Sequence, residues 1–226
     1  MIAKLKKVLL ANTMMRYLPL FLFLSFLFHS AWVFARIPIG LGFQGGVNLA
    51  NISVEYLTLS YEYDFSKRTG MMAGGFVEVE VVKFFSIQYD LLYVQKGAVW
   101  EVESVFPVTS TFKLDYFEMA FLFKAKVGQP MFKMYMFAGP NLGLLITAVQ
   151  EVKVGGQSTS INIKDLYRGV DLALDLGGGA EFAFAPKVAL FVNVRYSMGL
   201  MEIYRSQYEA WKLNGTQILG GTKFTF

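Results

Sequence analysis

The stretch VDLALDLGGGAEFAF, residues 170–184, decides the fold of this chain. Apolar residues take the even positions apart from Gly178, and Asp, Gly, Ala or Glu take the odd ones. Successive side chains of a β-strand point to opposite faces, so this alternation separates the two sets cleanly. A helical period of 3.6 residues would instead place Asp171 and Asp175 on the same face as Leu174. The stretch therefore predicts a strand with one apolar and one polar face.

The same pattern recurs along the chain, and it predicts eight strands. Short turns are expected at Lys83, at Gly128-Gln129-Pro130 and at Ala185-Pro186-Lys187. The segment 131–147 alternates poorly because both parities are apolar, so its sidedness stays open. The predicted strands are residues 37–49, 70–82, 85–96, 116–125, 131–147, 170–184, 188–197 and 216–226.

Connection lengths also alternate. The four long connections are about residues 51–69, 98–111, 148–169 and 201–215. Short turns on one side and long loops on the other are typical of outer-membrane β-barrels. The segments 53–65 and 152–164, the second around Gly155-Gly156, alternate enough to extend hairpins beyond the membrane. With eight strands, both termini are expected in the periplasm.

The N-terminus has the layout of an export signal. Lys4, Lys6 and Lys7 are followed by the apolar run 18–28 and by a small-x-small pattern that ends at Ala35. Met1, Met14 and Met15 all stay open as start codons. A transmembrane anchor is the alternative, but 17 interrupted apolar residues, 18–34, fall short of the roughly 20 that a spanning helix needs. We expect a signal peptide over 1–35 and one barrel domain over 36–226.

Composition limits the function of the mature chain. Of the 21 Lys and Arg residues, Lys4, Lys6, Lys7 and Arg16 lie in the signal, so the remaining 17 balance the 17 Asp and Glu. No basic patch is left to suggest nucleic acid as a partner. The chain has no cysteine, and its one histidine, His29, lies in the signal. Histidine-dependent catalysis and the usual zinc sites are therefore not expected, and neither is a cofactor.

The parity of the strands predicts where the charged residues lie. An eight-stranded barrel has an interior that side chains fill, and a buried charge must be paired. We expect a structural ion network in the lumen; a proton or solute path along the same residues, or catalysis by Glu78 and Glu80, are the alternatives. A soluble barrel would invert the two faces, but the long strands and the glycine-rich, charged face favour the membrane. The predicted lumen residues are Glu78, Glu80, Asp90, Lys96, Glu118, Lys124, Asp171, Asp175, Glu181 and Arg195.

The residues 40–45, Gly-Leu-Gly-Phe-Gln-Gly, match the spacing of a dinucleotide-binding fingerprint. That fingerprint needs a strand before it and a helix after it. Here the strand alternation continues straight through the motif. The glycines are therefore expected to make room in a narrow lumen.

Five motifs follow one another along the chain: residues 42–49, 91–97, 114–118, 138–140 and 193–196 with Gly199-Leu200. Together they resemble the Bacteroidetes outer-membrane β-barrel family called PorT-like, a small barrel of the OmpA/OmpX type. The chain departs from the family pattern at Ala120, where proline is usual. The resemblance implies a protein of the outer membrane, with Phe226 as the signal read by the barrel-assembly machinery.

The expected function is a structural or protein-interaction role in the outer membrane, without catalysis. The expected surroundings are membrane lipid, the assembly machinery during biogenesis and an envelope protein that binds the long loops. The family also includes a component of type IX protein secretion, so an accessory role in secretion is one alternative. A narrow solute or proton conduit is the other.

Overall fold

The computed structural model describes residues 38–56, 65–102, 108–205 and 209–226. The signal peptide expected over 1–35 lies outside these residues. No helix in the described part is long and apolar enough to cross a membrane. One short 3-10 helix, η1 (Lys164–Leu166), interrupts the strands. The strands are β1 (Ile39–Tyr56), β2 (Phe65–Val82), β3 (Phe85–Val102), β4 (Val108–Gln129), β5 (Phe132–Val154), β6 (Gln157–Asn162), β7 (Val170–Ala185), β8 (Val188–Gly199) and β9 (Glu209–Thr225).

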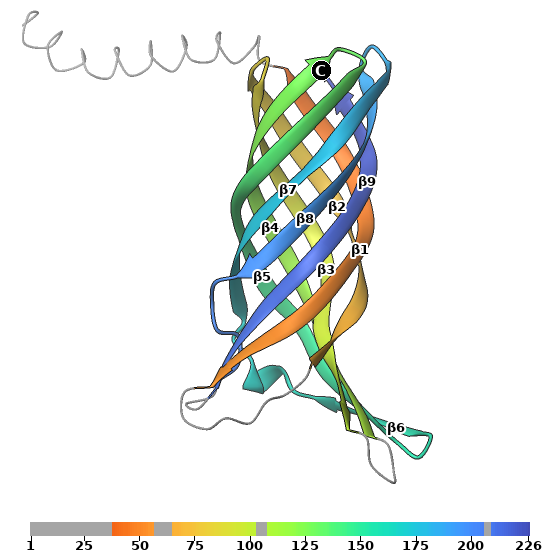
Figure 1. Ribbon diagram of the computed structural model, residues 1–226, viewed down its shortest axis with the longest axis vertical. Coiled ribbons are helices and arrows are strands. Elements are labelled where there is room, and N and C mark those ends of the chain that lie inside the picture. Colours follow the sequence, from red (N-terminus) through yellow and green to blue (C-terminus); the bar gives the residue numbers. More distant parts are fainter. Residues whose placement is uncertain (1–37, 57–64, 103–107, 206–208) are drawn as a thin grey trace, which may run out of the picture. The chain divides into compact units, whose positions relative to one another are not determined.

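Eight of these strands form a closed antiparallel ring (Figure 1). Each strand pairs with the next one in the chain, except that β7 follows β5 because β6 lies outside the ring. The ring closes where β1 pairs with β9, from Gly40 opposite Thr225 to Tyr56 opposite Glu209. Closure pairs every strand on both sides and leaves the ring without an open edge. The expected eight-stranded up-and-down barrel is confirmed.

The two faces of the barrel differ as the alternation predicts. Phe43 and Met136 point outward and are 72% and 74% exposed, whereas Asp90 and Gln217 point inward and are 0% exposed. A continuous apolar outer surface with a polar interior suits a lipid environment and would be unfavourable in water. In β5, whose sidedness the sequence left open, the odd residues such as Tyr135 and Asn141 face inward.

Four aromatic side chains of the interior lie over glycines on neighbouring strands. Phe76 is directly opposite Gly42, and Phe137 is opposite Gly177. A Cβ on Gly42 would come within 2.3 Å of the Phe76 ring. The glycines of the 40–45 motif that face inward therefore make room for a neighbouring ring or strand. The other two pairs are Tyr135 over Gly179 and Phe191 over Gly221.

The expected long connections were wrong in extent, because the strands run further. β1 continues to Tyr56, β3 to Val102 and β5 to Val154, while β2 starts at Phe65 and β4 at Val108. Backbone pairing needs no lipid-facing side chains, so the ladders continue past the apolar band.

Of the two extended hairpins expected, the one around Gly155-Gly156 is present. Both glycines have positive φ, 56° and 87°, and they join β5 to β6. The other, over residues 53–65, would continue β1 and β2 beyond the membrane. β1 does run to Tyr56, paired with β9, and β2 begins at Phe65. The tip of this hairpin, residues 57–64, lies outside the described part, so that expectation stays a prediction.

The aromatic–glycine pairs yield a first prediction. Gly42→Ala should destabilise the barrel by about 1–3 kcal/mol, since the new methyl group meets both the Phe76 ring and the Thr222 carbonyl oxygen. The matched control is Gly75→Ala on the outer face, where the nearest atom is 3.4 Å away. Urea unfolding in lipid vesicles, followed by tryptophan fluorescence, measures both. Equal stabilities for the two variants would contradict the packing argument.

Candidate functional site

The structure places all ten predicted lumen residues on the inner faces of β2, β3, β4, β7 and β8. Nine are buried, and the side chain of Glu80 is 24% exposed. Two lysines that the sequence reading missed also lie in the lumen, Lys126 and Lys223. Each lies an even number of residues from an inward-facing residue of the same strand, Lys126 from Lys124 and Lys223 from Gln217. The alternation of the sequence could therefore have placed both in the lumen.

One ion cluster lies toward the end of the barrel with the short turns. Its centre is Glu78, whose carboxylate accepts hydrogen bonds from Lys124, at 2.8 Å, and from Lys126. Lys223 is 3.5 Å from Glu78 and donates to Glu181 at 2.6 Å. The cluster thus joins β2, β4, β7 and β9, which are not all neighbours in the ring. It crosses the lumen and holds opposite walls together.

A second cluster fills the middle of the lumen. Arg195 donates to Asp90 at 3.0 Å and lies 3.5 Å from Asp175. Lys96 lies 2.5 Å from Glu118 and 3.2 Å from Asp171. The Asn141 amide donates to Glu118 at 2.9 Å and to Asp175 at 3.1 Å, which links the two halves.

Three of these buried cations also lie near an aromatic ring. The Lys124 ammonium is 4.2 Å from the Tyr135 ring centroid, and the Arg195 guanidinium is 5.3 Å from that of Phe137. Lys96 is likewise 5.3 Å from the centroid of Tyr116. The negative face of the ring stabilises a cation that has lost its water. Charges and rings together fill the lumen, as expected for eight strands.

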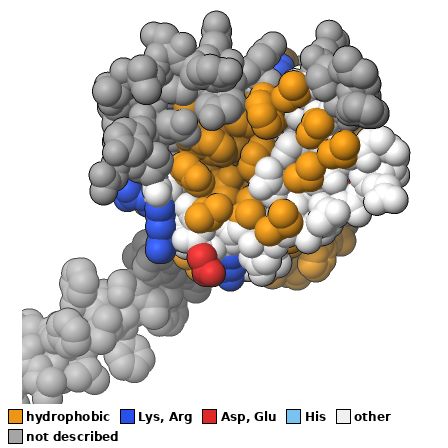
Figure 2. Space-filling view, turned by 90° about the horizontal axis from the view of Figure 1, so that it is seen from below, with side chains coloured by type: hydrophobic (Ala, Val, Ile, Leu, Met, Phe, Trp, Pro, Cys, Tyr) orange, Lys and Arg blue, Asp and Glu red, His pale blue; other side chains and the backbone are white. Residues whose placement is uncertain are grey.

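An apolar cluster, here called the mouth cluster, covers the charged lumen at the opposite, loop end. Its rings are in direct contact: Phe65 and Trp211 are 5.5 Å apart, and Trp211 stacks on Tyr204 at 4.5 Å. Figure 2 looks onto this end and shows apolar side chains gathered there. The sequence analysis placed most of these positions in loops and did not predict the cluster. Its buried members are Ile52, Phe65, Ala98, Phe112, Leu114, Tyr116, Leu145, Ala148, Ile163, Tyr167, Ile203, Trp211 and Leu213.

At the same end β3, β4 and β5 extend past the rest of the barrel and, with β6, form a projecting sheet (Figure 1). This projecting sheet consists of residues 97–102 of β3, 108–115 of β4, 147–154 of β5 and all of β6. At its base, residues 98–100 of β3 still pair with 65–67 of β2. In the described part of the chain β6 pairs with β5 alone, and its six residues are exposed. The backbone N–H and C=O groups along its other edge are therefore not paired with any strand in the described part of the chain.

Glu151 joins three strands of the projecting sheet. It forms an ion pair with Lys113 of β4 and accepts a hydrogen bond from the Ser158 hydroxyl of β6 at 2.9 Å. Lys153 lies 3.3 Å away. The hydrogen bond from Lys113, and after it those from Ser158 and Lys153, lower the pKa of Glu151 from 4.5 to about 2.

The terminal Phe226 has an exposed side chain and an anchored backbone. Its N–H donates to the carbonyl oxygen of Ile39 at 2.9 Å, and its side chain is 72% exposed. The last residue thus lies beside the start of β1, where the ring closes. Its reading as an assembly signal stays a prediction.

The pKa of Glu151 predicts how β6 responds to acid. A lowered pKa stabilises the folded form above the ordinary pKa of 4.5, and this contribution is lost as the pH falls toward 2. The chain has no cysteine, so Ser160→Cys accepts a single spin label. Its mobility should stay constant from pH 8 to about 5 and rise below about 4.5. In Glu151→Gln the mobility should be high at every pH; identical profiles would contradict this role.

The lumen yields a third prediction. Arg195→Met removes the cation that pairs with two buried carboxylates, Asp90 and Asp175. The substitution should lower the free energy of unfolding by about 3–5 kcal/mol. Adding Asp90→Asn should recover part of the loss, since it removes one of the two unpaired buried charges. Lys187→Met, in the exposed β7–β8 turn, is the control and should leave stability unchanged. Urea unfolding in vesicles measures all three, and a loss below about 1 kcal/mol for Arg195→Met would contradict the argument.

Several solved structures resemble this chain in the arrangement of their strands. Neisserial surface protein A is 14% identical, with 82% of this chain and 97% of that chain covered and a TM-score of 0.46. The N-terminal β-barrel domain of Pseudomonas aeruginosa OprF is 11% identical, with 84% and 97% covered and a TM-score of 0.45. Ail of Yersinia pestis, solved with the heparin analogue sucrose octasulfate, is 16% identical, with 82% and 99% covered and a TM-score of 0.38.

No functionally curated protein matches the sequence. The model of the outer membrane protein beta-barrel domain family matches residues 30–205, most of the chain. With the closed ring, the apolar exterior and the charged interior, this match assigns the protein to the bacterial outer membrane. The chain belongs to the outer membrane protein β-barrel domain family.

Proposed function

We propose that this protein is a non-enzymatic interaction module of the outer membrane, which binds an extended segment of an envelope protein along the free edge of β6. The single observation that carries the proposal is that edge: six exposed residues at the tip of a sheet that projects from the barrel. An unpaired strand edge is a ready template for an added strand, with main-chain hydrogen bonds supplying affinity.

The register identifies which groups of β6 are available. The Ile163 N–H donates to the Ala148 carbonyl oxygen, at 3.0 Å, and hydrogen bonding alternates along an antiparallel pair. Thr159 and Ile161 therefore exchange hydrogen bonds with β5. The backbone N–H groups of Ser158 and Ser160 point to the free edge.

The rest of the molecule acts in this proposal as a rigid mount. The ion clusters lock the barrel, and Glu151 ties β6 to β5 and β4. The filled lumen and the mouth cluster support this role over that of a conduit. The signal peptide over 1–35 would export the chain. The short turns and both termini are assigned to the periplasm and the projecting sheet to the cell exterior, by the usual loop asymmetry of these barrels.

An accessory role in secretion would use the same edge. Its support is the set of PorT-like motifs. It shares the mode of binding with the main proposal and differs from it in the identity of the partner. Loss of secreted cargo after deletion of the protein, together with a bound component of the secretion apparatus, would favour it.

The test uses one substitution at the free edge. Ser160→Pro removes the outward N–H without touching the β5 ladder, whereas the control Ser160→Ala keeps it. A photoreactive residue at Ile161, which is 51% exposed, reports contact in living cells. We expect a cross-linked adduct in the Ser160→Ala background and its loss in Ser160→Pro, with the shift in gel mobility on boiling unchanged. An adduct that persists in Ser160→Pro would contradict strand addition.

A further inference from the structure

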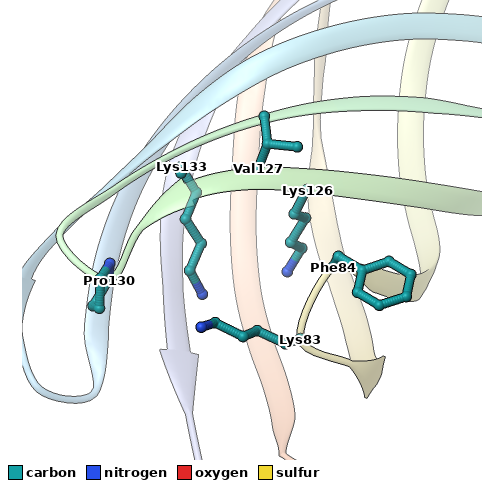
Figure 3. Close-up of a pocket in the computed structure, with 7 residues that line it drawn as sticks. Lys83, Phe84, Lys126, Val127, Pro130 and Lys133 are labelled. Carbon is teal, nitrogen blue, oxygen red and sulfur yellow. The ribbon is translucent and has the colours of Figure 1, made fainter.

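A basic cavity lies at the end of the barrel with the short turns. It has a volume of about 390 Å³ and lies between the β2–β3 turn and the β4–β5 turn. In Figure 3 the ammonium ends of three lysines, one each from the β2–β3 turn, β4 and β5, point toward one space. We call it the lysine cradle; its lining residues include Lys83, Phe84, Lys126, Val127, Pro130 and Lys133.

The charges around the cradle do not balance. Lys126 pairs with Glu78 and Glu80, and Lys133 lies 3.8 Å from Glu80. Lys83 has no ion pair within the described part of the chain. Five lysines, Lys83, Lys124, Lys126, Lys133 and Lys223, face only three carboxylates here: Glu78, Glu80 and Glu181. The end of the barrel that holds the cradle therefore carries excess positive charge.

The cradle also has an apolar wall. Phe84 is 68% exposed and Val127 is 70% exposed, and both continue the apolar outer surface of the barrel past the ends of the strands. Lysine beside exposed phenylalanine and valine, at the edge of the apolar band, is the environment where a phosphate meets acyl chains. A site for a soluble anion would not need this wall.

The backbone holds the cradle in shape. The Lys126 N–H donates to the Phe84 carbonyl oxygen at 2.8 Å, which fixes the β2–β3 turn against β4. On the other side the β4–β5 ladder continues to Gln129 opposite Phe132. The lysines therefore extend from a rigid frame, and a ligand would have to order only their side chains.

The geometry points to the head group of an anionic phospholipid as the occupant of the lysine cradle. The phosphate accepts charge-assisted hydrogen bonds from Lys83 and Lys133, and the proximal acyl chains lie against Phe84 and Val127. Charge complementarity favours this ligand over a zwitterionic lipid, and the adjoining apolar wall favours it over a soluble anion. The site is independent of β6, which lies at the opposite end of the barrel.

The test compares two lipids on the full-length mature protein. In detergent micelles, native mass spectrometry measures retention of phosphatidylglycerol and of phosphatidylcholine with the same acyl chains. We expect preferential retention of phosphatidylglycerol, and Lys83→Gln should weaken it about fivefold. Lys187→Gln removes the same charge at the same end but outside the cradle, and should leave retention unchanged.

Three results would overturn the proposal. The first is equal retention of both lipids by the unaltered protein. The second is an equal effect of Lys83→Gln and Lys187→Gln, which would indicate only general attraction to a basic surface. The third is displacement of phosphatidylglycerol by equimolar glycerol 3-phosphate, which would mean that the apolar wall contributes nothing. The shift in gel mobility on boiling verifies that each variant is folded.

Discussion

The structure depends on one constraint, that a chain crossing lipid must pair every backbone N–H and C=O within itself. The pairing of β1 with β9 meets it by closing the ring, with residues 40–56 opposite 209–225. Once the ring is closed, each strand has one face toward lipid and one toward a narrow interior. Within the barrel wall, each side chain is suited to one of these two environments.

The lumen imposes two constraints: it is narrow, and the charges in it are shielded from water. Glycine opposite an aromatic residue provides the space, as with Gly42 and Phe76. Each charge has a partner on another strand, as Arg195 has in Asp90, or a ring such as Phe137 nearby. These contacts cross the lumen, so they stabilise the closed shape and not merely single strand pairs.

Beyond the lipid the constraint is relaxed, and the two ends of the barrel diverge. At the loop end β3, β4 and β5 continue as a sheet whose last strand, β6, keeps an open edge. At the short-turn end the chain turns tightly and gathers lysines around a cavity. For these two ends we propose different partners, an extended protein segment at the loop end and an anionic phospholipid at the short-turn end. The barrel between them is filled by side chains.

The sequence by itself determined where most of the strands lie, which way their residues face and ten charged residues of the lumen, because the two-residue period of a strand is a local property. It did not determine β5's sidedness, where both parities are apolar. Strand ends, ion-pair partners, the mouth cluster and the lysine cradle were decided only by the tertiary structure. Lys126 could be assigned to the inside by parity, but its contact with Glu78 depends on how β2 and β4 are placed across the ring. That placement follows from register summed over several strand pairs, which no single segment encodes.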